Sequence, residues 1–208
     1  MKNKKLKTDI STNDQLIRTV LKSSLEKQHL NDHPVRIIEE LGVKHGSCRV
    51  DIAVINGVMH GYEIKSDLDT LQRLHEQIAA YNSVFNQMTL VVGVKHVYEA
   101  MDMIPDWWGI TIAKINTNEV VTLSCIRKPE NNDQQDSISI AQLLWRDEAL
   151  KILEETNSIK GVSTKPRRII YERLASILTP ELLQEKVRER LCFRTNWRVD
   201  QQLPISGG

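Results

Sequence analysis

Two strand-like segments joined by Asn56-Gly57 constrain the fold of this chain more than any other feature. Both segments are rich in β-branched and other apolar residues, as is typical of strands, and they read CRVDIAVI and MHGYEIKS. An Asn-Gly pair favours the positive φ angles of tight hairpin turns. We therefore predict an antiparallel β-hairpin between residues 48 and 66.

Apolar periodicity predicts the elements around this hairpin. Residues 16–25 and 71–85 repeat apolar side chains at helical spacing, the second helix having an N-cap among Ser66, Asp67 and Asp69. Strands are predicted within residues 35–41, 88–94 and 108–115. A strand, a helix and a buried strand in succession indicate a right-handed parallel crossover. The prediction is an α/β domain with an αβββαβ core and a mixed central sheet.

Changes in composition predict the domain boundaries. Residues 1–10 are basic and are expected to form a disordered arm, and residues 11–126 carry the α/β pattern. Residues 127–137 are polar without apolar period, which is typical of a linker. Residues 138–208 read as helices, so an all-helical C-terminal region is expected.

Composition excludes several classes of protein. The net charge of +1 over 208 residues gives no general preference for nucleic acid. The three cysteines lie far apart without a C-x-x-C motif, which argues against a disulfide framework or zinc knuckle and favours a reducing cytosol. No segment is apolar enough to span a bilayer, so a cytoplasmic protein without membrane contact is expected.

The hairpin carries a cluster of charge. Asp51 lies on its first strand, and Glu63 and Lys65 alternate with apolar residues on its second. Such side chains commonly form weak ion pairs on a solvated sheet. Carboxylates that converge in a partly buried site instead need a divalent cation, and hard oxygen ligands suit Mg²⁺, with Mn²⁺ as a substitute.

The register of the hairpin decides whether this cluster forms. With a simple two-residue turn, Asp51 would stand opposite Tyr62 and Glu63 would point to the other face. A one-residue bulge at Gly57 or Gly61 would bring both carboxylates to one face.

The run RVDIAVINGVMHGYEIKS followed by QIAAY resembles the PD-(D/E)xK, or restriction-endonuclease-like, nuclease superfamily in its RecB-like Q-x-x-x-Y variant. It is also similar to uncharacterised bacterial and phage proteins that carry an EIKSD run. The resemblance spans roughly residues 35–115. It implies the restriction-endonuclease-like form of the αβββαβ core and a metal-dependent phosphodiesterase.

The resemblance implies a metal site on three strands. Asp51 and Glu63 would be ligands, and the main-chain carbonyl of Ile64 would add another. The upstream acid common in this superfamily would be Glu40 rather than Glu39, because Glu40 ends the first strand.

The resemblance also implies catalytic roles for residues beside the metal. Lys65 would be the catalytic lysine, and Gln77 and Tyr81 match Q-x-x-x-Y on one side of a helix. Tyr81 equally fits a place in the core. The sequence departs from the motif at Val50, where proline is common.

We expect a Mg²⁺-dependent deoxyribonuclease. The alternatives are an inactive nucleic-acid-binding or regulatory protein on the same fold, and an RNA-cleaving toxin or defence effector. Arg73, Arg167 and Arg168 are candidate DNA contacts, although the C-terminal basic residues fit packing or oligomerisation as well. Restriction-like nucleases often act through two sites, which makes a homodimer plausible.

Overall fold

The computed structural model describes residues 11–118 and 120–195 of the chain. Helices and strands alternate through its first two thirds, and helices alone follow. In chain order the elements are α1 (Asp14–Gln28), β1 (Arg36–Val43), η1 (Lys44–Gly46), β2 (Cys48–Ile55), β3 (Met59–Lys65), α2 (Leu74–Asn82), β4 (Gln87–Gly93), η2 (Val94–His96), α3 (Val97–Met103), β5 (Gly109–Ile115), β6 (Val121–Arg127), α4 (Ser137–Ala141), α5 (Arg146–Glu155), α6 (Arg167–Ile177) and α7 (Pro180–Phe193).

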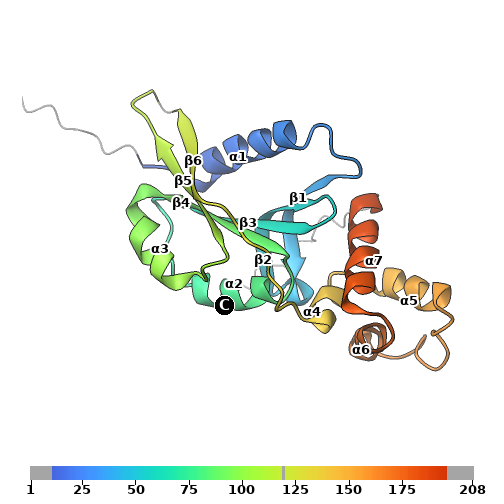
Figure 1. Cartoon of the computed structure of the whole chain (residues 1–208). Coiled ribbons are helices and arrows are strands. Elements are labelled where there is room, and N and C mark those ends of the chain that lie inside the picture. The colour runs from blue at the N-terminus through green and yellow to red at the C-terminus, as the bar shows by residue number, and fades with distance from the viewer. Residues whose placement is uncertain (1–10, 119, 196–208) are drawn as a thin grey trace, which may run out of the picture.

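The strands form one six-stranded mixed sheet in the order β1-β2-β3-β4-β5-β6. The first three strands are an antiparallel meander, β4 and β5 are parallel to β3, and β6 returns antiparallel to β5. Helix α2 connects β3 to β4 and α3 connects β4 to β5 (Figure 1). The predicted α/β class, with a mixed sheet and a helical C-terminal region, is confirmed.

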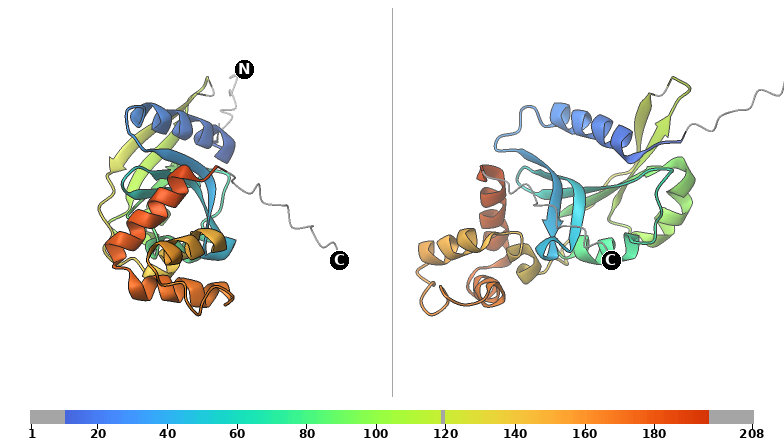
Figure 2. Two further views of the ribbon diagram at one scale, coloured as in Figure 1. Left: turned by 90° about the vertical axis from the view of Figure 1, so that its right-hand side faces the viewer. Right: turned by 180° about the vertical axis from the view of Figure 1, so that it is seen from behind.

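Helices cover the two faces of the sheet unequally. Of the helices within residues 11–118 and 120–195, only α1 lies on one face, where Ile17, Leu21 and Leu25 pack against apolar residues of β2 to β6. Helices α2 and α3 lie on the other face, and α4 to α7 are grouped at the β1–β2 end of the molecule (Figures 1 and 2). The larger of the two apolar cores belongs to this second face.

The hairpin turn sets the register on which the acidic cluster depends. Residues 56–58 connect β2 to β3, and Ile55 pairs with Met59. Gly57 has φ +99°, a conformation open to glycine at little cost. The pairing runs on without a recorded shift, so the offset arises at the turn and not at Gly61.

Two elements escaped the sequence analysis. Strand β6 lies at the edge of the sheet, and most of its side chains are at least partly exposed, so its apolar period is weak. Helix α3 has only seven residues, too few for a clear helical period.

The predicted start of α2, with an N-cap among Ser66, Asp67 and Asp69, was wrong. The Asp69 carboxylate accepts hydrogen bonds from the main-chain N–H and hydroxyl of Ser66 and closes a turn there. The helix therefore begins only at Leu74, with Arg73 as its N-cap.

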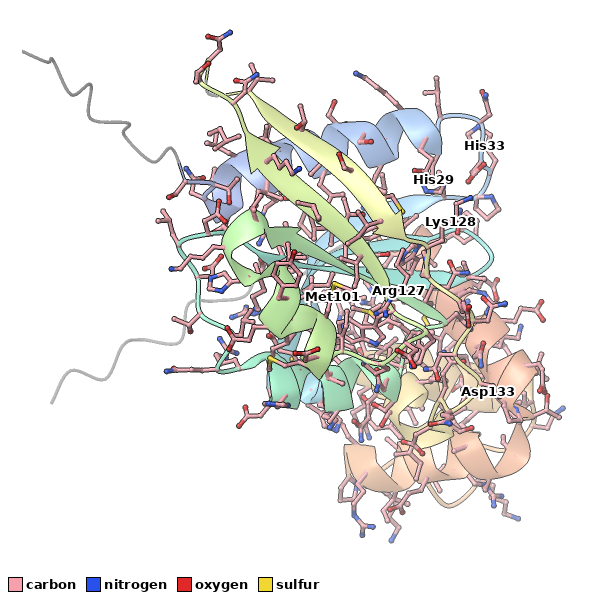
Figure 3. All side chains as sticks on the ribbon, turned by 60° about the vertical axis from the view of Figure 1, so that its left-hand side comes forward. His29, His33, Met101, Arg127, Lys128 and Asp133 are labelled. Carbon is pink, nitrogen blue, oxygen red and sulfur yellow. The ribbon has the colours of Figure 1, made fainter. Side chains whose placement is uncertain are left out.

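Residues 128–136, in the segment predicted as a linker, contain no helix or strand but are fastened to the sheet domain. Asn132 is buried, and its side-chain amide donates to the carbonyl oxygens of Asn82 and Phe85 at 2.7 and 3.0 Å. Arg127, labelled in Figure 3, binds the carbonyl oxygens of Trp108 and Pro105 just before this segment.

The C-terminal helices share the larger core with the sheet, since Ile140, Leu174 and Leu183 belong to the same cluster as Ile38 and Ile55. The domain boundaries at 127 and 137 stay a prediction, but the helices are packed against the sheet rather than tethered to it. The predicted arm at residues 1–10 lies outside the described residues.

Cys48, Cys125 and Cys192 are free thiols. Across the described part of the chain, no helix combines the length and the apolar character needed to cross a bilayer.

We expect Asn132→Ala to lower the free energy of unfolding by about 1–3 kcal/mol, because the carbonyl oxygens of Asn82 and Phe85 would lose their buried donor. Urea denaturation measures the change. Asn131→Ala is the control, since Asn131 is exposed and its bond to Gln87 lies at the surface. Equal stabilities of the two variants would contradict the prediction.

Candidate active site

Three acidic residues stand in one row across β1, β2 and β3. Glu39 pairs with Ile52 and Leu41 with Val50, so Glu40 stands across from Asp51. Ile52 pairs with Tyr62, and the next step of that register sets Asp51 opposite Glu63. The hairpin therefore aligns Asp51 with Glu63 rather than with Tyr62. This is the register predicted for a hairpin with one extra residue at its turn.

Glu63 is the centre of a buried hydrogen-bond network. Its side chain is only 2% exposed. Oε1 accepts from Nζ of Lys65 at 2.6 Å and from Nε2 of Gln77 at 2.5 Å, and Oε2 lies 2.8 Å from the hydroxyl of Tyr81. Strand β3 supplies the carboxylate and the lysine, and α2 supplies the amide and the phenol from positions four apart.

Burial, and after it the nearby charge of Asp51, raise the pKa of Glu63 to about 7, against the lowering effects of Lys65 and Tyr81. The hydroxyl of Tyr81 also lies 2.5 Å from the carbonyl oxygen of Arg49. One hydroxyl proton can serve only one of these two acceptors. A protonated Glu63 resolves the conflict, because it can donate to Tyr81 while Tyr81 donates to the carbonyl.

Asp51 is held from two directions. Its Oδ2 accepts from the main-chain N–H of Ile64 at 2.7 Å, and its Oδ1 accepts from Nη2 of Arg18 at 2.6 Å. Burial raises the pKa of Asp51, against the lowering effect of the bond from Ile64 and the charge of Arg18. Arg18 comes from α1, the helix on the opposite face of the sheet (Figure 1).

Glu40 takes a different position from the other two acids. Its φ of +54° is unusual for a residue with a side chain. The side chain is 53% exposed, with Oε1 3.0 Å from Nη1 of Arg18 and Oε2 3.9 Å from Nε of Arg49. Glu40 is therefore linked to Asp51 through Arg18.

The oxygens around Glu63 suit a hard divalent cation. Burial is the main cause of the raised pKa of Glu63, and the charge of Asp51 on the adjacent strand adds to it; a cation would relieve the repulsion between the two carboxylates. Oε1 of Gln77 adds a buried acceptor without a hydrogen-bond partner. Within residues 11–118 and 120–195, no three acidic, histidine or cysteine side chains gather closely enough to hold a metal ion by themselves. The remaining ligands would be water, main chain or substrate.

The structure brings together the predicted residues Asp51, Glu63, Lys65, Gln77 and Tyr81. Their roles remain predictions. Ile64 meets Asp51 through its N–H, and its carbonyl as a metal ligand likewise remains a prediction.

The three arginines predicted to bind DNA lie outside this network. Arg73 is exposed at the start of α2, and Arg167 and Arg168 are exposed on α6. Arg168 is paired with Glu172 at 2.5 Å, which neutralises part of the local positive charge.

Sequence reasoning missed Asp14 and Arg18. Their four-residue spacing predicts an ion pair on one side of α1, and Nε of Arg18 does lie 3.1 Å from Oδ1 of Asp14. The second partner of Arg18, Asp51, is 33 residues away, and no local pattern indicates that contact.

Glu63→Gln should change how stability depends on pH. The folded protein keeps the proton of Glu63 up to about pH 7 and the unfolded chain releases it near 4.5, so ionisation lowers the free energy of unfolding as pH rises through this window. Glu63→Gln has no carboxyl to ionise at this position, so its free energy of unfolding does not fall for this reason. From pH 4.5 to 8 its stability relative to wild type should increase by roughly 1–3 kcal/mol.

Urea denaturation across this pH range measures the effect. Glu76→Gln, at an exposed position of α2, is the control and should show a constant difference from wild type. A constant difference for Glu63→Gln as well would mean that the carboxylate ionises normally.

The chain is similar in sequence to a bacteriophage protein. A sequence model described as "Bacteriophage P4 protein cII" matches residues 7–202. The curated relative named Protein cII, from Enterobacteria phage P4, is 29% identical over 151 residues, which cover 73% of this chain and 56% of the relative. The chain thus spans little more than half the length of that relative. No solved structure matches it. The chain belongs to the bacteriophage P4 protein cII family.

Proposed function

We propose that this protein is a divalent-metal-dependent nuclease that hydrolyses phosphodiester bonds in DNA. The observation that supports it is the convergence on Glu63 of Lys65, Gln77 and Tyr81, beside Asp51 on the adjacent strand. These are the residues of the D…E-x-K and Q-x-x-x-Y motifs, and they come from three elements, β2, β3 and α2.

Each side chain has a role in this proposal. Asp51 and Glu63 hold the cation, with Glu40 at the open end of the row. When bound, Mg²⁺ or Mn²⁺ supplies Lewis-acid stabilisation of charge on the phosphate. Lys65 uses one N–H donor on Glu63 and has two more with which to orient a water or a phosphate oxygen. The water oxygen would bond to phosphorus while the bond to the 3′ oxygen breaks; the water would release one proton to solvent, and the leaving 3′ oxygen would take one up from solvent.

Gln77 and Tyr81 position Glu63 in this scheme. Both are buried, and their bonds fix the carboxylate against rotation. DNA would reach the row from the side of the exposed Arg73, and Arg167 and Arg168 would contact more distant backbone. We further propose a cytoplasmic protein, which acts as a homodimer if both strands are cut.

A second candidate, a nucleic-acid-binding protein without turnover, is favoured by the state of Lys65. Its side chain is only 11% exposed and is paired with Glu63, and Arg18 already neutralises Asp51. In this case the network stabilises the sheet and α2, and binding would depend on the exposed arginines.

Incubation of plasmid and oligonucleotide DNA with Mg²⁺ or Mn²⁺ tests the proposal. We expect cleavage that EDTA abolishes and that Lys65→Ala slows by roughly 100-fold to 10,000-fold, a range typical of losing a side chain that acts directly on the reacting water. Lys114→Ala, at an exposed position of β5, is the matched control and should cleave at the wild-type rate.

The outcomes separate the candidates. Cleavage that persists in EDTA and in Lys65→Ala would contradict the proposed mechanism. DNA binding without turnover in either metal, with Glu63→Ala binding normally, would support the second candidate. An RNA substrate assayed in parallel identifies an RNA-cleaving effector if RNA alone is degraded.

A further inference from the structure

Arg18 is the most completely coordinated charged side chain near the acidic row. Its Nη1 lies 3.0 Å from the carbonyl oxygen of Asp51 and 3.0 Å from Oε1 of Glu40. Its Nη2 lies 2.6 Å from Oδ1 of Asp51 and 3.3 Å from Oδ2 of Asp14. With Nε donating to Asp14, Arg18 makes four hydrogen bonds and, to Glu40, a further ion pair.

The surroundings of Arg18 keep it charged. Burial acts to lower its pKa, but hydrogen bonds and charges of Asp14 and Asp51 outweigh that effect and raise the pKa above its ordinary value. The side chain is 13% exposed. Arg18 therefore stays a cation beside Asp51, and a divalent ion that binds Asp51 must displace it.

The position of Arg18 conflicts with a metal at Asp51. A divalent ion bound to the Asp51 carboxylate would stand a few ångströms from the guanidinium, and two positive charges so close in a partly buried site repel strongly. The metal and Arg18 therefore compete for the same oxygens.

Asp14 provides a second place for Arg18. The Asp14–Arg18 pair lies within α1 at i,i+4 spacing and joins Nε and Nη2 to both carboxylate oxygens. This fork survives when the contacts of Arg18 with Asp51 and Glu40 break. The guanidinium can leave the sheet without becoming unpaired.

We propose that Arg18 is a built-in counter-cation of the acidic row, which occupies Asp51 and Glu40 until a divalent ion displaces it onto Asp14. This inference rests on the proposed metal-dependent function. It adds a regulatory role for α1, which carries both the competing cation and the carboxylate that would receive it.

The competing interpretation is that Arg18 has only a structural role, in which its ion pairs with Asp51 and Glu40 attach α1 to the sheet. The two interpretations differ in the effect of Arg18→Gln on metal affinity. Loss of a competing charge tightens metal binding, whereas loss of a structural attachment leaves it unchanged or weakens it by disordering Asp51.

Titration calorimetry with Mn²⁺ alone, on the full chain, tests the inference. We expect Arg18→Gln to bind Mn²⁺ at least tenfold more tightly than wild type. Arg18→Lys, which keeps the charge, should bind within about threefold of wild type, given the ordinary context-dependence of such values. Lys22→Ala is the matched control, because Lys22 pairs with Glu39 from the same helix but outside the row, and its affinity should equal that of wild type.

A measurement on wild type avoids dependence on the folding of Arg18→Gln. In ¹⁵N NMR of the arginine Nε–H groups, Mg²⁺ should shift the Arg18 signal, which is assigned by its absence in Arg18→Lys. Metal binding without such a shift, or equal affinities of wild type and folded Arg18→Gln, overturns the inference and leaves the proposed function standing. Absence of metal binding in every variant overturns both.

Discussion

The burial of the Glu63 carboxylate is the constraint on which the rest of this site depends. A carboxyl at 2% exposure is costly to ionise, so Glu63 keeps its proton up to about pH 7, accepts hydrogen bonds from Lys65 and Gln77, and donates one to Tyr81. These contacts hold α2, which carries Gln77 and Tyr81, against the sheet beside Glu63. A group of residues that would otherwise favour solvent is thereby concentrated in the core.

The charge balance of the row is divided between the two faces of the sheet. Lys65 compensates Glu63 from within β3, and Arg18 compensates Asp51 from α1 on the other side. A catalytic cluster and a structural one would both satisfy this balance in the absence of metal. The two differ in their response to a divalent ion. Only in a catalytic cluster must the positively charged side chains give up carboxylate oxygens to the metal.

Much of the fold could be predicted from the sequence, and the failures have physical causes. The hairpin, the parallel crossover and the burial of β4 follow from strong local periodicity. Strand β6 was missed because an edge strand is largely solvated, and α2 starts late because Asp69 caps a turn at Ser66 instead. The resemblance to nucleases identified the five network residues, while membership of the phage P4 protein cII family carries no statement about their chemistry.

The sequence by itself determined which strands carry the acids and which side of α2 carries Gln77 and Tyr81, because strand and helix periodicity are short-range relations. It left open whether Asp51 faces Tyr62 or Glu63, and the three-residue connection at residues 56–58 sets the register that favours Glu63. Only the tertiary structure decided what neutralises Asp51, because the approach of Arg18 depends on the packing of α1 across 33 intervening positions. No pattern within a single element carries that information.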